Sequence, residues 1–494
     1  MTNGTDYKEG VFMDSLSNFK DRIRKKSLLS KIMSPEEASQ YIQPNMLIGC
    51  SGFTPVGYPK VIPAALAKRA ETEGPVPLTL WCGASSGREI DEELASSGCI
   101  KRRYPYQSNK VMRSMINEGK IEYSDIHLSM GGQNLRYGFY GKMDVALIEA
   151  AAITENGGIV PSTAVGDAAA YVRCANKVII EINLTQPAEL EGMHDIFIPQ
   201  DPPYRKPLPL RSVRDRIGVP FIECGAGKIL GIVPSSVPDC GVLYDKRCDP
   251  VSEKIAANVL NLLDLENKRP IIPINQLPLQ FGVGRVANIV LSELAKTVRG
   301  DIKIYSEVLQ DAVLDLIDAG KLAFASGTSL TMTKGGLQRL FQHLEDYKEK
   351  ILLRSEEISN SPEIIRRLGV IAVNTALEAD IFGNVNSSHN GYDIVNGIGG
   401  SGDFARNAYL TIFVCPSLYK TDGSSNIVFN CSHVDHTEHD VDVIITEYGV
   451  ADLRGLTRTE RAKEIIGKCA HPSHRCGLYK RLRSMRHCRR ETGA

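Results

Sequence analysis

Short apolar runs of strand length alternate along this chain with amphipathic stretches of helix length. In the helical stretches apolar residues recur at intervals of three and four, as between Val308 and Ile317, which is the spacing of one helix face. Strands that alternate with helices in this way form mainly parallel sheets that are buried on both faces. The strand-length runs lie at 77–81, 145–148, 177–182, 302–305, 370–373, 410–414 and 441–446. The pattern therefore predicts an α/β fold with largely parallel, open sheets.

Two passages, 46–66 and 277–294, share one pattern: an apolar strand, a turn rich in Gly or Pro, and a helix. Each is followed by an acid-flanked turn (153–160 and 379–387) and then by a Gly-Asp pair. We infer two α/β domains of related design, with a boundary inside the Pro-, Gly- and Asp-rich stretch 233–250. The predicted organisation is a helical N-terminal extension at 1–35, one α/β domain at 36–235 and a second at 236–494.

The charge balance and the cysteine spacing narrow the class of protein. The 494 residues include 58 Lys and Arg and 58 Asp and Glu, which argues against a general nucleic-acid binder with a basic footprint. The 12 cysteines form no C-x-x-C pair, which favours free thiols in a reducing compartment. No apolar run approaches the length of about 18 residues that a membrane span needs. The first 35 residues mix acids with bases, unlike a secretory or transit leader. We therefore expect a cytoplasmic protein that binds neither nucleic acid nor membrane.

Glu307 is the first candidate for chemistry, because it falls where the predicted strand 302–305 gives way to a helix. In open α/β sheets, ligands bind beyond the carboxyl ends of the strands. A carboxylate at that place lies near a helix N-terminus, which favours its ionised form. An ionised carboxylate suits a nucleophile or a base. The alternative is a solvated or helix-capping glutamate.

Two glycine-rich turns are candidates for binding an anion or an oxyanion. The turn Gly282-Val283-Gly284 leaves a predicted strand and opens a helix, where free backbone N–H groups bind anions. The loop 396–404 holds four glycines and is typical of a nest of N–H donors. Both turns also match the dinucleotide pattern G-x-G-x-x-G/A, and Glu307 lies at the spacing of a ribose-binding acid. Two donor loops beside one carboxylate would instead suit an oxyanion hole, and plain surface turns are the third possibility.

Two other patterns are typical of different chemistry, and a third is missing from the chain. The segment 432–440 holds five residues of metal-ligating type, and its His436-x-x-His439 has the spacing of two metal ligands on a helix. The five are His433, Asp435, His436, Glu438 and His439. The segment precedes a strand, however, and no separate Cys/His cluster completes a shell, so we expect a polar loop near the site and no metal. Ser85 stands in a G-x-S-x-G match that would make it a hydrolase nucleophile, with a turn before a helix as the alternative. The chain lacks a Walker P-loop, which argues against ATP-driven chemistry.

Seven motifs follow one another in a fixed order. They are S-G-F-T-P-x-G-Y-P-K (51–60), L-P-L-Q-x-G-V-G-x-V-A-N (277–288), Y-S-E-V-L-Q-D (305–311), E-I-S-N-x-P-E-I-I-R-R-L-G-V-I (357–371), N-G-I-G-G-S-G-D-F (396–404), S-H-V-D-H-T-E-H-D (432–440) and T-E-Y-G-V-A-D-L-R-G-L (446–456). Together they cover roughly residues 33–474 and closely resemble the acetyl-CoA hydrolase/transferase family. The nearest similarity is to its succinyl-CoA:acetate and propionyl-CoA:succinate CoA-transferases.

The resemblance implies an acyl-CoA:carboxylate CoA-transferase that works by ping-pong chemistry through a glutamyl-CoA thioester. Glu307 matches the family nucleophile, and the backbone N–H groups of Val283 and Gly400 match its oxyanion donors. The fold that it implies has two CoA-transferase-like α/β domains with the active site at their interface. Residues implied in binding substrate and CoA are Gly282, Gly284, Asn360, Gly399, Lys420 and Glu447.

The resemblance also sets expectations for ligands, assembly and competing functions. CoA esters are expected as substrates, without a tightly bound cofactor, and the protein is expected to be a homodimer. Phe281 replaces a small residue of the family pattern, and a basic tail follows His474. The sequence leaves three alternatives: an acyl-CoA hydrolase that uses the same glutamate, a non-catalytic ligand-binding α/β protein, and a dinucleotide oxidoreductase.

Overall fold

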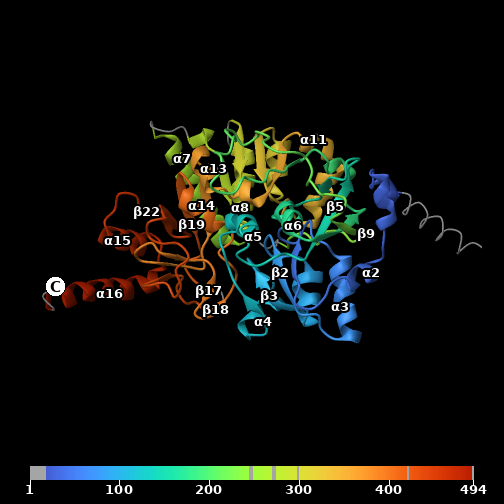
Figure 1. Cartoon of the computed structure of the whole chain (residues 1–494). Coiled ribbons are helices and arrows are strands. Elements are labelled where there is room, and N and C mark those ends of the chain that lie inside the picture. The colour runs from blue at the N-terminus through green and yellow to red at the C-terminus, as the bar shows by residue number, and fades with distance from the viewer. Residues whose placement is uncertain (1–17, 244–248, 270–273, 298–299, 420–421, 492–494) are drawn as a thin grey trace, which may run out of the picture. The chain divides into compact units, whose positions relative to one another are not determined.

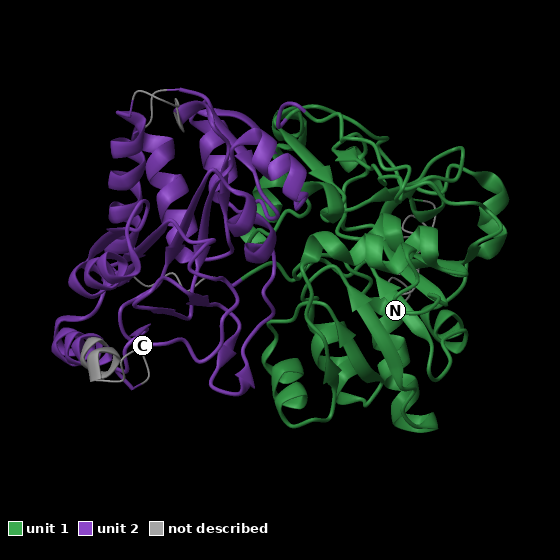
Figure 2. Cartoon of the chain, turned by 60° about the vertical axis from the view of Figure 1, so that its left-hand side comes forward, with its two compact units in different colours: residues 1–210, 214–242, 326–359 green, residues 211–213, 243–325, 360–494 purple. Residues whose placement is uncertain are grey.

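The computed structural model describes residues 18–243, 249–269, 274–297, 300–419 and 422–491 (Figure 1). The chain divides into two compact units (Figure 2). Unit 1 consists of residues 1–210, 214–242 and 326–359, and unit 2 of residues 211–213, 243–325 and 360–494. The return of 326–359 to unit 1 is a feature that the sequence does not predict. The boundaries drawn above at 35 and 235 stay predictions, and residues 1–17 of the expected helical extension lie outside the described residues.

Unit 1 contains a sheet of eight strands in the order β4-β3-β2-β1-β5-β7-β9, with β6 paired to β5. All of these pairs are parallel except β5–β6. The central strand β5 is buried along its whole length, as a sheet covered on both faces requires. The strands are β1 (Leu47–Cys50), β2 (Leu78–Cys82), β3 (Ile100–Tyr104), β4 (Glu122–Tyr123), β5 (Val145–Ile153), β6 (Ile159–Pro161), β7 (Lys177–Asn183) and β9 (Ile229–Ser235).

Helices and short segments complete unit 1. Strands β8 (His194–Asp195) and β13 (Ile351–Arg354) pair in parallel. A capping box between Ser34 and Glu37 begins α2, which packs against α3. The α-helices are α2 (Pro35–Gln40), α3 (Val61–Glu73), α4 (Lys110–Asn117), α5 (Gly131–Arg136), α6 (Ala168–Cys174), α10 (Lys334–Gln342), α11 (Leu344–Lys348) and α12 (Glu356–Ser359). The short 3-10 helices are η1 (Lys26–Lys31), η3 (Leu128–Met130) and η4 (Ala188–Leu190), and η2 (Glu89–Leu94) is a π-helix.

Unit 2 contains strands in the order β22-β21-β19-β14-β10-β11. They are parallel except for the terminal pair β21–β22. The carboxyl ends of the parallel strands therefore lie at one edge of the sheet, where ligands bind in such folds. These strands are β10 (Leu279–Phe281), β11 (Ile302–Tyr305), β14 (Ile371–Thr375), β19 (Leu410–Val414), β21 (Val443–Thr446) and β22 (Gly449–Asp452). The chain crosses from unit 2 to unit 1 within β12 (Leu322–Gly327).

Unit 2 also contains short strands and helices that precede, separate or follow these strands along the chain. Strand β15 pairs with β16 and with β20, and β17 forms a hairpin with β18. These short strands are β15 (Glu378–Asp380), β16 (Val385–Asn386), β17 (His389–Asn390), β18 (Asp393–Ile394) and β20 (Ile427–Val428). The helices are α7 (Pro250–Asn267), α8 (Arg285–Thr297), α9 (Ala312–Asp318), α13 (Pro362–Leu368), α14 (Ser401–Asn407), α15 (Arg458–Lys468) and α16 (Pro472–Glu491), and η5 is a short turn (Ile274–Gln276).

The predicted α/β class is confirmed, and each of the seven apolar runs overlaps a strand, although β5 extends five residues beyond the run at 145–148. The helix predicted from Val308 begins later, at Ala312. Cysteines with described side chains are free thiols, in agreement with the expectation from their spacing. Within the described ranges, no helix is both long and apolar enough to cross a bilayer.

Lys60, the last residue of the 51–60 motif, lies at the centre of a buried charge network in unit 1. Its Nζ forms ion pairs with Glu149 and, at 2.8 Å, with Asp239, and the three side chains are at most 2% exposed. Glu181 accepts the backbone N–H groups that begin α3. Burial raises the pKa of Glu149 to about 7, and only Lys60 and polar neighbours oppose that rise. This motif therefore has a structural role in unit 1.

Replacing Lys60 by Met leaves buried carboxyl groups without their cation. We expect Lys60→Met to lower the free energy of unfolding by about 3–5 kcal/mol, because removing one partner of a buried pair strands the other charge. Thermal unfolding followed by circular dichroism measures the effect. Lys68→Met, on the exposed side of α3, is the matched control and should leave the melting temperature nearly unchanged. Equal melting temperatures for the two variants would contradict a stabilising role for this network.

Candidate active site

Glu307 lies just beyond the carboxyl end of β11, two residues after Tyr305. The adjacent Ser306 donates its hydroxyl to the carbonyl oxygen of Phe281, at the end of β10, over 3.3 Å. This bond connects the ends of neighbouring parallel strands β10 and β11. Glu307 is half-buried as a residue. The sheet thus places a reachable acid at its ligand-binding edge.

The Glu307 carboxylate receives two hydrogen bonds from donors far away in the sequence. Asn360, directly after α12, donates its Nδ2 to Oε1 over 2.7 Å. The backbone N–H of Gly400, at the N-terminus of α14, donates to the same carboxylate. A Cβ at position 400 would collide with Oε1, so any larger residue there would displace the Glu307 carboxylate from this position. The structure therefore brings three of the predicted residues, Glu307, Asn360 and Gly400, into one group.

Asp403 is a fourth member of this group, and the sequence did not assign it a role. It lies in the first turn of α14 and is 3% exposed. Its Oδ2 accepts a second hydrogen bond from Asn360 Nδ2, over 3.2 Å. One amide therefore bridges two carboxyl groups. In the sequence Asp403 belongs to the 396–404 motif and to the Gly402-Asp403 pair of the repeat, but neither pattern indicates its contact with Asn360.

The surroundings of Glu307 raise its pKa to about 8. Burial is the largest cause, and the negative charge of Asp403 adds to it, whereas the bonds from Asn360 and Gly400 act in the opposite direction. The sequence predicted that a helix N-terminus would favour the ionised carboxylate. Gly400 at the N-terminus of α14 does lower the pKa, but burial outweighs it, so the predicted net direction is wrong. Helix α9 begins only at Ala312, and a helix dipole acts mainly within its own first turn, so desolvation dominates at Glu307.

The turn at 282–284 is held by Gln310, a residue of the 305–311 motif for which the sequence predicts no role. Gln310 Nε2 donates to the carbonyl oxygen of Gly282 over 3.1 Å, and its Oε1 accepts the N–H of Gly284 at 3.2 Å. The Val283 side chain is 44% exposed. Among the described residues, the donors to Glu307 are Asn360 and Gly400, and Val283 is not one of them. Its proposed role toward an oxyanion stays a prediction.

The remaining predicted residues lie in three different settings. Gly399 has a φ of 59°, a left-handed conformation that favours glycine, and leads into Gly400. Glu447 accepts the N–H of Ser417 at 2.9 Å and its hydroxyl at 2.5 Å, which fixes the segment after β19. Lys420 lies outside the described residues, so its predicted contact with CoA stays open.

His436 holds the loop that carries Gly400. Its ring is 3% exposed, and its Nε2 lies 3.1 Å from Ser401 Oγ. Ser401 Oγ itself donates to the carbonyl oxygen of Ile398 over 2.6 Å, so the serine accepts from the protonated nitrogen of His436. The 432–440 segment is therefore a polar loop against the candidate site, as expected, and His436 is a residue whose positioning role the sequence did not reveal.

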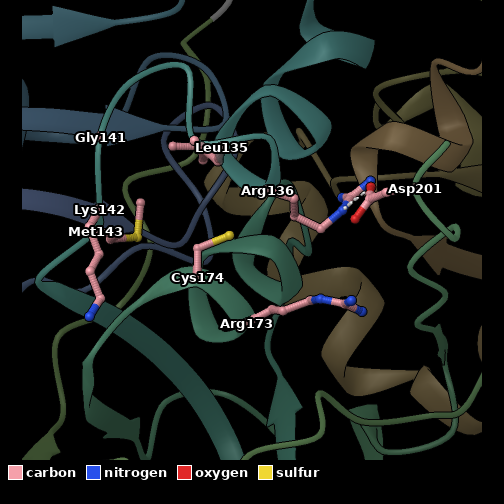
Figure 3. Close-up of a pocket in the computed structure, with 9 residues that line it drawn as sticks. Leu135, Arg136, Gly141, Lys142, Met143, Arg173, Cys174 and Asp201 are labelled. Atoms are coloured by element: carbon pink, nitrogen blue, oxygen red, sulfur yellow. Dashed lines mark hydrogen bonds and ion pairs between the residues drawn. The ribbon is translucent and has the colours of Figure 1, made fainter.

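Two of the pockets formed by described residues lie in unit 1, and neither of these is lined by a predicted site residue. One, of about 500 Å³, is shown in Figure 3, where Arg136 faces Asp201 at 3.0 Å and Arg173 extends beside Cys174. The second, of about 710 Å³, has a largely apolar wall between α6 and residues 217–225. Ser85, the alternative nucleophile, accepts a hydrogen bond from Ser108 at 3.1 Å. It lies in a turn before η2, which is the structural alternative considered for this motif.

Comparison with known proteins agrees with the resemblance. The chain matches the profile of the acetyl-CoA hydrolase/transferase N-terminal domain over residues 16–234 and that of the C-terminal domain over residues 336–482. It is 48% identical over 456 residues to a succinyl-CoA:acetate CoA-transferase of Clostridium kluyveri, across 92% of this chain and 85% of the relative. It is 44% identical over 474 residues to an acetyl-CoA hydrolase of Yarrowia lipolytica, across 92% and 90%.

The fold agrees with that of solved structures. RipA from Yersinia pestis superimposes with a TM-score of 0.73 at 22% sequence identity, and the match covers 94% of this chain and 99% of RipA. At that identity the likeness concerns the fold. The α/β architecture predicted from the apolar runs is therefore confirmed by a second route.

Proposed function

Because the chain belongs to the acetyl-CoA hydrolase/transferase family, we propose that it is an acyl-CoA:carboxylate CoA-transferase with Glu307 as nucleophile. Its proposed substrates are CoA esters and free acids of short chain length, with succinyl-CoA and acetate first among them. The observation that carries the proposal is the Glu307 carboxylate at the sheet edge, bonded to the amide of Asn360 and the N–H of Gly400.

The reaction proceeds by exchange at one carboxyl group. The Glu307 carboxylate attacks the thioester carbonyl, and the oxyanion accepts the backbone N–H groups of Val283 and Gly400. Collapse of this intermediate gives an acyl-glutamyl anhydride and releases the CoA thiolate. The thiolate attacks the glutamyl carbonyl, which frees the first acid and leaves a glutamyl-CoA thioester. The incoming carboxylate reverses these steps. One thioester replaces another, so no ATP is consumed.

The nucleophile is weak, so binding energy must assist the reaction. Contacts with parts of CoA remote from the thioester supply that energy in the transition state. We place Lys420 and Glu447 among the residues that contact CoA, and Gly282, Gly284 and Gly399 along the substrate path. Gly400 exchanges its partner during turnover, because the N–H that holds the resting carboxylate is proposed to hold the oxyanion afterwards.

A raised pKa at the nucleophile predicts a distinct pH profile. Only the ionised carboxylate attacks, so kcat/KM for the acyl-CoA should fall about tenfold for each pH unit below about 8. Asp403→Asn removes a negative charge that raises the pKa of Glu307, so its profile should shift to lower pH. Asp264→Asn, at an exposed site of α7, is the control and should leave the midpoint unchanged. A flat profile, or equal shifts in both variants, would contradict this assignment.

The hydrolase is the second candidate function, because the chain is 44% identical to an acetyl-CoA hydrolase. It uses the same intermediate, which water then resolves. Incubation with succinyl-CoA, with and without acetate, separates the two functions by mass spectrometry and thiol titration. A transferase forms acetyl-CoA without free thiol and is nearly inactive without acetate. Rapid thiol release that acetate does not suppress would identify the hydrolase.

The assembly and the location of the protein are also proposals. We propose a homodimer without a tightly bound cofactor, which is what the family resemblance implies, and a cytoplasmic location, which the free thiols favour. Light scattering on the purified full chain tests the dimer, since a monomeric mass at micromolar concentration would overturn it. Mass spectrometry of the native protein tests for a bound cofactor.

A further inference from the structure

Three side chains of unit 2 form a cluster that the proposed reaction does not use. His389 comes from the β17–β18 hairpin, and His433 and Asp435 come from the 432–440 segment. One ligand atom from each lies within 4.8 Å of the others. His433 Nε2 is 3.3 Å from Asp435 Oδ1, and the two imidazole rings stack with their centroids 3.8 Å apart. Two imidazoles and a carboxylate therefore converge from two separate segments.

The two segments are joined independently of any ion. Val385 and His436 form an antiparallel bridge, and the backbone N–H of Ser387 donates to Asp435 Oδ2 over 2.7 Å. Because these bonds hold the backbone of both segments, the three side chains are brought together by the fold itself. Because the backbone is already ordered, a ligand that binds these side chains loses little conformational entropy of the chain, which favours affinity.

Ser388 determines which ring nitrogen of His389 carries the proton. Its hydroxyl oxygen lies 2.7 Å from His389 Nδ1 and 2.6 Å from Asp435 Oδ1, and the residue is 1% exposed. A carboxylate accepts only, so the hydroxyl donates to Asp435 and accepts from Nδ1–H of His389. The lone pair of a neutral His389 is thereby left on Nε2. Polar partners that orient a ligating histidine in this way are typical of metal sites.

We propose that His389, His433 and Asp435 bind a divalent transition-metal ion of the Zn²⁺ class. Two imidazoles with one carboxylate suit Zn²⁺, Co²⁺ or Ni²⁺, whereas Mg²⁺ and Ca²⁺ prefer oxygen ligands throughout. The 3.3 Å between His433 Nε2 and Asp435 Oδ1 equals the edge of a tetrahedron whose bonds are about 2.0–2.1 Å long. His433 is exposed at its ring and is free to adjust its angle when the ion enters.

This site differs from the metal pair considered in the sequence. His436 is directed to Ser401, and His439 lies exposed on the surface. The ligands are instead His433 and Asp435, two other candidates in the same segment, together with His389, which only the fold brings near. No metal is expected from the sequence because no second cluster accompanies this segment, and His389 supplies the missing ligand.

Titration of chelator-stripped full-length protein with Co²⁺ tests the proposal. We expect visible d–d absorption that saturates at one equivalent per chain and disappears when Zn²⁺ displaces Co²⁺. His433→Ala and His389→Ala should each raise the Kd for Co²⁺ at least about tenfold, since even partners outside the ligand set contribute that much. His439→Ala is the matched control and should bind as the parent does. Zn²⁺ should also raise the melting temperature of the parent and of His439→Ala. It should not raise that of His433→Ala or His389→Ala.

Several results would overturn the metal site. They are the absence of saturable absorption, equal binding in His433→Ala and the parent, or thiolate charge-transfer bands that place the ion at cysteines such as the exposed Cys240 and Cys476. His433→Ala removes an exposed ring, so this variant is expected to fold. It therefore still tests the proposal if His389→Ala does not fold. Because the readout is spectroscopic, its outcome is independent of the proposed transferase reaction.

Discussion

Glu307→Gln is expected to reduce CoA transfer by at least about 10⁴-fold, the scale of losing the nucleophile of a covalent mechanism. The amide has nearly the shape of the carboxylate, and its oxygen still accepts a hydrogen bond from Asn360 or Gly400, so the site should keep its structure. It cannot form the anhydride, because a carboxamide is not a nucleophile of useful strength. Initial rates of acetyl-CoA formation from succinyl-CoA and acetate measure the loss.

The control for this variant is Glu345→Gln, at an exposed position of α11 in unit 1, which should retain full activity. Circular dichroism and the melting temperature verify that Glu307→Gln is folded. A folded Glu307→Gln that keeps more than about one hundredth of the parent rate would rule out a covalent role for this carboxyl group.

Gly400→Ala is expected to lower kcat/KM by at least about 100-fold. The added Cβ would occupy the space of the Glu307 carboxylate, so either the nucleophile or the loop that begins α14 must move. A displacement of about 1 Å at a reacting group costs on the order of 100-fold, and alanine keeps the backbone N–H, so the loss comes from misalignment of the donor and the nucleophile. Stopped-flow or coupled assays over a range of succinyl-CoA concentrations separate kcat from KM.

Gly477→Ala is the matched control, because a Cβ there meets no atom within 4 Å. It lies in α16 of the same unit and should leave kcat/KM unchanged. If Gly400→Ala were as active as Gly477→Ala, the close contact between the loop and the nucleophile would have no part in the reaction.

The sheet strands could be predicted because burial on both faces demands continuous apolar runs. Strands β7, β11 and β19 fall almost where the runs at 177–182, 302–305 and 410–414 do. Helix α9 was predicted too early. Residues 308–311 share its apolar spacing, but Gln310 is used instead to hold the turn at 282–284. A tertiary hydrogen bond thus outweighs local periodicity.

The centre of the site was predictable only through motifs that a family resemblance connects. Glu307, Asn360 and Gly400 lie far apart in the sequence, and their meeting follows from strand order, which periodicity does not encode. Asp403 and His436 were each inside a quoted motif, yet their partners Asn360 and Ser401 are revealed only by coordinates. The sign of the pKa shift at Glu307 was missed for the same reason, because burial depends on neighbours from several segments.

The most direct measurement is a search for CoA bound covalently to Glu307 during turnover. The full-length protein is incubated with acetyl-CoA alone, treated with borohydride or with hydroxylamine, digested and analysed by peptide mass spectrometry. The account predicts reduction or hydroxamate formation at Glu307 in the peptide that contains residues 305–311, and no such product in Glu307→Gln. A stable, active enzyme whose trapped label lies on another residue, or that carries no label at all, would contradict it.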